Sequence, residues 1–174
     1  MALAGEQAHR RALEELYVAH ERGLYNVAYR YVWSADEARD VVQDAFVRLW
    51  NKRERIDWER AVGLAYTIVL GIAHNRRRAR AVRRAFGLAS SEDEPARAPR
   101  ADDALDAARL DAHVRRCIEE LPDKLRSVLV MSLFSGLDYA EIGAALGIPA
   151  GTVGSRRTEA VARIRARLEE QGHG

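Results

Sequence analysis

Apolar residues recur every three to four positions along most of the chain, and this spacing predicts helices. In the N-terminal half it runs through residues 13–31, 41–49 and 64–73. The segment 51–60 breaks the period and predicts a charged loop around Trp58. Because no segment carries the alternating pattern of a strand, we expect an all-α fold.

The helical pattern stops over residues 86–104, where prolines, serines and acidic residues gather, and it resumes from about Leu105. This change in composition is typical of a linker. We therefore predict two small helical domains joined by a flexible linker. The N-terminal helical bundle covers residues 10–84, the acidic linker covers 85–107, and the C-terminal domain covers 108–170.

The C-terminal domain contains the most specific local motif of the chain. Asp138 and Glu141 have the spacing of a capping box at the start of a helix. Gly147 suits the left-handed position that ends this helix, and Pro149 suits the first turn of the next one. Two short helices joined in this way predict a DNA-binding helix-turn-helix. The alternative is an ordinary helical hairpin with a solvated surface.

Charge is distributed unevenly, although the net charge of the 174 residues is only +2. Residues 1–84 sum to +5, and residues 85–111 sum to −4. Six arginines lie within residues 76–84, and arginine both binds phosphates in a bidentate way and stacks on bases. This segment predicts a second nucleic-acid site, or alternatively a solvated basic helix end. Trp58 lies upstream and predicts either stacking on an unpaired base or a core position.

The composition excludes several other functions. Cys117 is the single cysteine, so an intramolecular disulfide is excluded; we expect a small apolar role for it, with a redox switch as the alternative. The five histidines lack metal-ligand spacing, and no catalytic constellation is present. We therefore expect no metal, no cofactor and no enzymatic activity. Without a membrane-length apolar run or a signal-peptide core, the chain is expected to be cytoplasmic and not inserted in a membrane.

Three segments, in this order, resemble one protein family. They are SADEARDVVQDAFVRLW from Ser34, IVLGIAHNRRR from Ile68, and LPDKLRSVLVMSLFSGLDYAEIGAALGIPAGTVGSR from Leu121. Together they resemble bacterial RNA polymerase sigma factors of the extracytoplasmic-function group, over roughly residues 10–84 and 108–169. The resemblance implies a promoter-specificity subunit that binds core RNA polymerase, recognises the −10 and −35 promoter elements and promotes DNA melting.

The resemblance also assigns three sets of residues. Those matching the segment that binds the polymerase β′ clamp helices are Asp36, Glu37, Asp40, Gln43, Asp44 and Phe46. Those near the melted −10 strand are Trp58, Asn75, Arg76, Arg77, Arg80, Arg83 and Arg84, and the loop of residues 51–62 matches the element that holds a flipped base. Those matching −35 contacts are Arg126, Thr152, Ser155, Arg156 and Arg157. The implied partners are core polymerase, through its β′ clamp helices and β flap, promoter DNA as duplex and melted strand, and an anti-sigma factor.

Helical spacing supports part of this assignment independently. An acidic ridge along one side of a helix follows from helical spacing, and its residues are Asp36, Glu37, Asp40 and Asp44. A polymerase-independent helix-turn-helix regulator is the alternative function, but such a protein normally dimerises on a palindrome and has no need for this ridge.

The sequence departs from the family pattern at a few positions. Gly154 stands where a long polar side chain is usual, and Arg157 stands where a leucine usually packs inward. Either Arg157 runs along the edge of the core or the helix is rotated slightly, and Gly154 is expected to weaken the helix by about 1 kcal/mol. Such changes bear on promoter preference more than on class.

Overall fold

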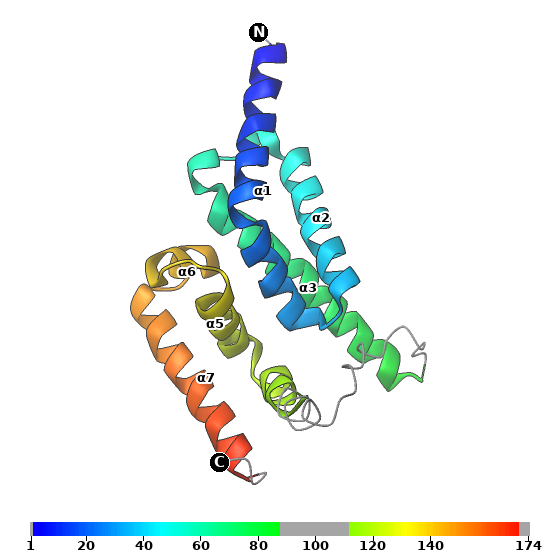
Figure 1. Cartoon of the computed structure of the whole chain (residues 1–174), viewed down its shortest axis with the longest axis vertical. Helices are drawn as coiled ribbons and strands as arrows, with labels where there is room; N and C mark the ends of the chain where they lie inside the picture. The colour runs from blue at the N-terminus through cyan, green and yellow to red at the C-terminus, as the bar shows by residue number, and fades with distance from the viewer. Residues whose placement is uncertain (1, 88–111, 171–174) are drawn as a thin grey trace, which may run out of the picture.

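The computed structural model describes residues 2–87 and 112–170. These residues form helices and short turns, and no strand occurs among them, which confirms the predicted all-α class. The N-terminal domain contains α1 (Ala2–Val32), α2 (Ala35–Asn51), two 3₁₀ turns η1 (Arg53–Arg55) and η2 (Trp58–Arg60), and α3 (Ala61–Ala85) (Figure 1). The C-terminal domain contains a helical segment at 112–120, α5 (Asp123–Phe134), α6 (Tyr139–Leu146) and α7 (Ala150–Glu170).

The N-terminal domain is a bundle in which α1, α2 and α3 each contact the other two. The chain turns between α1 and α2 at Trp33, a buried residue with φ of 54°. The Ser34 hydroxyl then accepts a hydrogen bond from the Glu37 main-chain N–H, which begins α2. The Glu37 carboxylate does not complete a capping box, because it pairs with Arg80 on α3 instead. The N-terminus of α2 therefore has only one of the two bonds of a capping box, and its first turn is joined to α3 through Glu37.

In the C-terminal domain the helix-turn-helix forms as the sequence predicts. The Glu141 main-chain N–H donates to the Asp138 carboxylate, and the Asp138 main-chain N–H donates to the Glu141 carboxylate. These are the two hydrogen bonds of a capping box. Gly147 ends α6 in the left-handed conformation, with φ of 66°. The Ile148 N–H then donates to the Gly143 carbonyl at 2.9 Å, and the chain enters α7 directly after Pro149.

The two domains pack directly against each other. The buried apolar residues of both form one continuous cluster, and α3 contacts α6 while α1 contacts α5. Helix α6 lies beside α3 (Figure 1). Gly23 allows this approach, because a Cβ there would lie 2.9 Å from the Ser135 carbonyl oxygen, whereas a Cβ on Gly63 would lie at an ordinary contact distance, 3.6 Å from the Cβ of Ala145. The sequence did not predict this contact, and residues 88–107 of the predicted linker lie outside the described residues.

Gly154 lies inside α7, and replacing it with alanine should stabilise the protein. A Cβ there would meet the ring of Tyr139 at 3.5 Å, an ordinary contact distance. Alanine also restricts the unfolded chain, so we expect Gly154→Ala to raise the free energy of unfolding by roughly 0.5–1 kcal/mol in urea titrations.

Gly143→Ala provides the matched control, because a Cβ at Gly143 would lie 2.6 Å from the Ile148 carbonyl oxygen. The main chain would have to shift, so this substitution should destabilise the same domain. Equal effects of the two substitutions would contradict the turn geometry described above.

Candidate nucleic-acid interface

The exposed side of α7 carries the polar residues predicted to contact duplex DNA. Val153 is fully buried against the rest of the helix-turn-helix, and this orients the remainder of the helix. Thr152, Arg156 and Arg157 are half-buried, and Ser155 is exposed. Within the described ranges, neither Arg156 nor Arg157 has an ion-pair or hydrogen-bond partner. Their guanidinium groups are therefore available for an anion such as a DNA phosphate or for a base edge.

Arg126, predicted as a −35 contact, lies in the interior and is only 2% exposed. Its guanidinium donates to the main-chain carbonyls of Ile118 (2.7 Å), Glu119 and Leu121 (2.7 Å). A fourth hydrogen bond, of 3.3 Å, reaches the carboxylate of Asp123. Burial lowers the pKa of Arg126 from its ordinary value. The prediction for this residue is corrected: Arg126 holds the end of the helical segment 112–120 against α5.

The arginines of α3 separate into buried and surface groups. Arg80 is 9% exposed; it donates to the Val32 carbonyl at 3.0 Å and pairs with Glu37. This burial corrects its prediction as a −10 contact, because its side chain joins α3 to α1 and α2. Arg76 is half-buried, with a salt bridge of 2.7 Å to Asp44 and one of 3.9 Å to Asp40.

Other residues predicted for −10 DNA lie on or near the surface of α3. Asn75, Arg83 and Arg84 are exposed, and the two arginines lie in the last turn of the helix. Arg77 is half-buried, and its guanidinium binds the Asp123 carboxylate of α5 at 2.5 Å. The predicted set therefore does not form one continuous surface, since part of it faces the C-terminal domain.

Trp58 packs against the core, which favours the core position over an exposed stacking platform. It is half-buried, and its ring stacks on that of His9 with centroids 6.1 Å apart. Its indole nitrogen is buried with no hydrogen-bond partner among the described residues. The segment predicted as a charged loop forms the two 3₁₀ turns η1 and η2, with the Asp57 carboxylate capping the second.

The acidic ridge predicted on α2 faces outward in part. Asp36, Asp40 and Gln43 are exposed, and Asp36 pairs with Arg39 at 2.7 Å on the same helix. Asp44 and Glu37 are joined to the arginines of α3, as described above, and Phe46 is buried at 9% exposure with its ring edge against Tyr17. Asp40, at the centre of the ridge, is therefore accessible to a partner, whereas the charges of Glu37 and Asp44 are neutralised by arginines of α3.

Two regions of the chain match one family. Residues 16–83 match Sigma-70 region 2, and residues 112–164 match Sigma-70, region 4. Over 173 residues, the chain is 32% identical to the ECF RNA polymerase sigma factor SigL of Mycobacterium tuberculosis, with 98% of this chain and 95% of that protein covered. The chain belongs to the extracytoplasmic-function group of the sigma-70 family.

Other sigma factors show similar relationships over different lengths. The chain is 27% identical over 168 residues to SigW of Bacillus subtilis, which covers 91% of this chain and 90% of that protein. It is 30% identical over 153 residues to SigE of Mycolicibacterium smegmatis. The matched region covers 87% of this chain and 60% of SigE, which is longer. The family as a whole supplies the promoter-recognising sigma subunit.

Solved structures share the fold. CnrH, in complex with the cytosolic domain of CnrY, has a TM-score of 0.69 at 23% identity over 97% of this chain and 95% of that one. The sigma factor RpoE of Bartonella quintana, in complex with the anti-sigma factor NepR, has a TM-score of 0.58 at 21% identity over 94% and 95% of the two chains.

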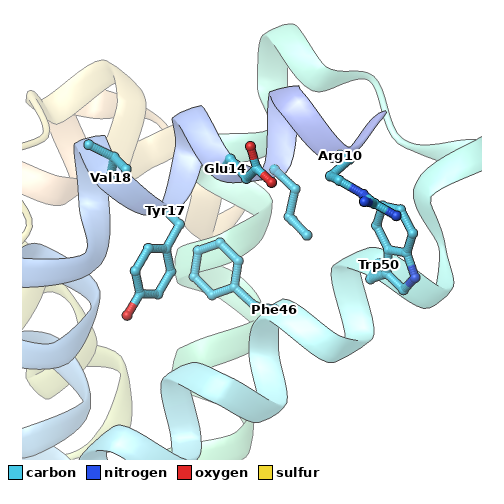
Figure 2. A pocket seen from close by; sticks show the side chains of 7 residues that line it. Arg10, Glu14, Tyr17, Val18, Phe46 and Trp50 are labelled. Carbon is cyan, nitrogen blue, oxygen red and sulfur yellow. The ribbon is translucent and has the colours of Figure 1, made fainter. Parts of the chain in front are cut away.

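This sigma factor also has apolar surface that the motifs did not identify. A groove of about 570 Å³ runs between α1 and α2, with Leu13, Tyr17, Phe46 and Trp50 among its lining residues (Figure 2). Val18, beside it, is 83% exposed. In the sequence, Leu13 and Tyr17 belong to the apolar stripe of α1. That pattern fits a position in the core as well as a position on a surface groove, so the sequence alone could not reveal the groove.

A second groove, of about 470 Å³, lies on the region 4 domain. Its apolar lining combines the helical segment 112–120, α5 and α7, and consists of Val114, Ile118, Leu129, Leu133, Val161, Ile164 and Leu168. Leu133 is 52% exposed there. No cluster of potential metal ligands occurs in residues 2–87 or 112–170, and no helix within these ranges is long and apolar enough to cross a membrane.

Arg126→Ala should unfold region 4 more readily rather than remove a DNA contact. The carbonyls of Ile118 and Leu121 would lose a charged donor inside the protein, so we expect the free energy of unfolding to fall by roughly 3 kcal/mol in chemical denaturation. Arg165→Ala, at an exposed position of α7, is the matched control, and as a surface change it should stay within about 0.5 kcal/mol of the parent. An Arg126 variant with parental stability and reduced DNA affinity would restore the original assignment.

Proposed function

We propose that this sigma factor directs core RNA polymerase to promoters with separate −10 and −35 elements and has no catalytic activity of its own. The observation that carries the proposal is the presence, in one chain, of two half-buried arginines on α7 (Arg156 and Arg157) that have no ion-pair partner among the described residues and of an acidic, partly apolar surface on α2. A helix-turn-helix regulator acting alone needs only the first of these surfaces.

In this proposal α7 reads the −35 element in the major groove. Near its N-terminal end lie Thr152 and Arg156, which are half-buried, and Ser155, which is exposed. Arg156 reaches a base edge or an adjacent phosphate, and Arg157 binds the backbone. Gly154, between Thr152 and Ser155, has no side chain and lies beside the ring of Tyr139, so sequence selection depends on the flanking residues.

The −10 element is assigned to the outer side of α3. Arg76, Arg83 and Arg84 lie along its second half, where they contact the backbone of the melted strand, and Asn75 lies at the edge of α3 that faces the C-terminal domain. The turns η1 and η2 provide the flank on which an unstacked base would be held. The cost of unstacking, a few kcal/mol, is offset by these arginine contacts and by the site that receives the base.

Core polymerase is assigned to the two grooves. The exposed carboxylates of Asp36 and Asp40 on α2 suit basic residues of a partner, and the groove between α1 and α2 suits an apolar helix face, as proposed for the β′ clamp helices. The groove on region 4, with Leu133 exposed in its wall, suits an apolar helix of the β flap.

A partner that restrains the chain until it is needed belongs to the same proposal. RpoE of Bartonella quintana is captured with an anti-sigma factor in a fold that this chain shares. We propose an anti-sigma partner for this chain and a cytoplasmic location, where polymerase and promoter DNA are found. A stable one-to-one complex with a product of a neighbouring gene would support this, and a freely active monomer in the cell would contradict it.

Transcription by purified bacterial core polymerase, with and without the chain, on a pooled promoter library tests the function. The expected result is a set of new start sites that share two short upstream motifs. Clean duplex binding without new start sites would instead support a regulator that acts without polymerase.

Arg156→Ala should weaken −35 recognition by about 1–3 kcal/mol if its guanidinium reaches a base edge. The measurement is the affinity of holoenzyme for the preferred −35 sequence and for single-base variants of it. Discrimination should be lost at one position and retained at the others. An equal loss of affinity for every sequence would restrict Arg156 to phosphate contact.

Asp40→Lys should weaken core polymerase binding at least about tenfold, because it reverses an exposed charge at the open centre of the ridge. Its contact with Arg76 is long, 3.9 Å, so circular dichroism should show unchanged helicity. Glu6→Lys makes the same charge change on an exposed position of α1 and should leave binding intact. A loss of helicity in the Asp40 variant would contradict its assignment to docking.

A further inference from the structure

The turns η1 and η2 are held to the rest of region 2 by few side chains. Within residues 51–60, Arg53, Ile56 and Trp58 are half-buried, and the other side chains are exposed. The hydrogen bonds of a 3₁₀ turn have poorer geometry than those of an α-helix. The position of this segment therefore depends on the contacts that its three half-buried side chains make.

These contacts lead to two different helices. The guanidinium of Arg53 lies 4.5 Å from the ring centroid of Trp50, at the end of α2, and donates to the Trp50 carbonyl at 3.1 Å. Ile56 and Trp58 pack against the apolar core. Trp58 also stacks on His9 of α1, with the two ring planes at 29° to each other. This stack joins η2 to the first turns of α1.

The indole N–H of Trp58 makes the stack more important for the position of the ring. Its nitrogen is buried and has no hydrogen-bond partner among the described residues. A buried donor that is left unpaired disfavours the position of its side chain. The packing of Trp58 on the core and its stack on His9 must offset this cost. Loss of the stack would leave the ring with less to hold it in place.

His9 occupies a well-defined place on α1. Among the side chains that the structure describes, it is the first along the chain that is not exposed. Leu13, one turn later, packs against the core, and residues four apart share one side of a helix. The side of α1 that enters the core at Leu13 therefore presents His9 to Trp58. The match to Sigma-70 region 2 begins at residue 16, so His9 lies outside it.

A site that receives a single unstacked base needs close control of its position. Groups that form a binding site must be held within about 0.5 Å of the productive geometry, and packed supporting residues provide this control. The turns η1 and η2 are the flank assigned to the unstacked base. A contact that fixes η2 is therefore expected to affect how well the base is held.

We propose that His9 is a positioning residue for −10 recognition, which holds Trp58 and, through it, the turn η2. This inference rests on the proposed function, because that function assigns η1 and η2 to the unstacked base. His9 acts through Trp58 and needs no contact with the DNA. The first turns of α1 thus belong to the −10 reader together with α3.

Amide hydrogen exchange of the full chain tests the structural step without polymerase or DNA. The Arg60 main-chain N–H donates to the Asp57 carbonyl at 3.1 Å, across η2. His9→Ala should speed exchange of this N–H at least about threefold, because an aromatic pair contributes a factor of roughly two to ten to an equilibrium. His9→Phe keeps an aromatic ring and should restore the parental rate. Gln7→Ala, at an exposed position of α1, is the matched control and should change nothing.

The fluorescence of 2-aminopurine tests the functional step, because this base becomes brighter when it leaves the stack. The probe is a promoter selected in the transcription experiment, with 2-aminopurine at each position of the melted −10 strand in turn. In holoenzyme, His9→Ala should lower the signal at one position at least about threefold. Transcription from that promoter should fall with it, and His9→Phe should restore both.

Two further affinities separate positioning from a general loss of structure. Binding of core polymerase and binding of duplex −35 DNA should be the same in the parent and in His9→Ala. A loss of both together with the −10 signal would make His9 merely structural and would overturn the inference. An unchanged exchange rate at Arg60 would also overturn it, and so would faster exchange with an unchanged 2-aminopurine signal.

Failure of the proposed function would give a different result. A parental chain that directs no transcription would contradict that function, whatever the His9 variants do. Exchange at Arg60 needs neither promoter nor polymerase, so it would still decide whether His9 holds η2 in place.

Discussion

The arginines of α3 set the main constraint on this structure, because their charges must be balanced wherever the helix packs against protein. The buried Arg80 pairs with Glu37 and the half-buried Arg76 with Asp44, both on α2. Arg77 faces the other way and binds Asp123 of region 4. One helix thus completes the core of region 2, fixes α2 beside it and supplies the surface on which region 4 rests. The nucleic-acid contacts assigned to α3 must use what these structural contacts leave exposed.

Arginine has a second structural use here that is common to both domains. Arg80 donates to the carbonyl of Val32, the last residue of α1, and Arg126 donates to carbonyls at the end of the helical segment 112–120. Carbonyls at helix C-termini lack partners within the helix and carry partial negative charge. A planar cation with several donors satisfies a group of them at once, which a lysine does not do as well. These two side chains therefore connect consecutive helices instead of contacting DNA.

The sequence predicted interactions between residues that are close together along the chain, and it missed interactions between residues that are far apart along it. The capping box of Asp138 and Glu141 and the left-handed Gly147 were predictable, because their partners lie within a few positions. The burial of Arg126 and Arg80 was not, since an arginine in a basic or polar segment gives the same pattern whether it faces solvent or a distant carbonyl. The domain contact was also missed, because it depends on the absent side chain at Gly23, which leaves no periodic signal.

The ion pairs of α3 have a consequence for the thermodynamics of DNA binding. An arginine that neutralises a phosphate normally allows a condensed cation to leave the DNA, and this release makes affinity depend steeply on salt. Arg76 and Arg77 begin instead as partners of carboxylates, which must themselves acquire counterions when the arginines leave them. The entropy gained when cations leave the DNA is then partly offset by the entropy lost when cations gather at the freed carboxylates of the protein. The dependence of affinity on salt should accordingly be shallower than the six arginines of this segment imply.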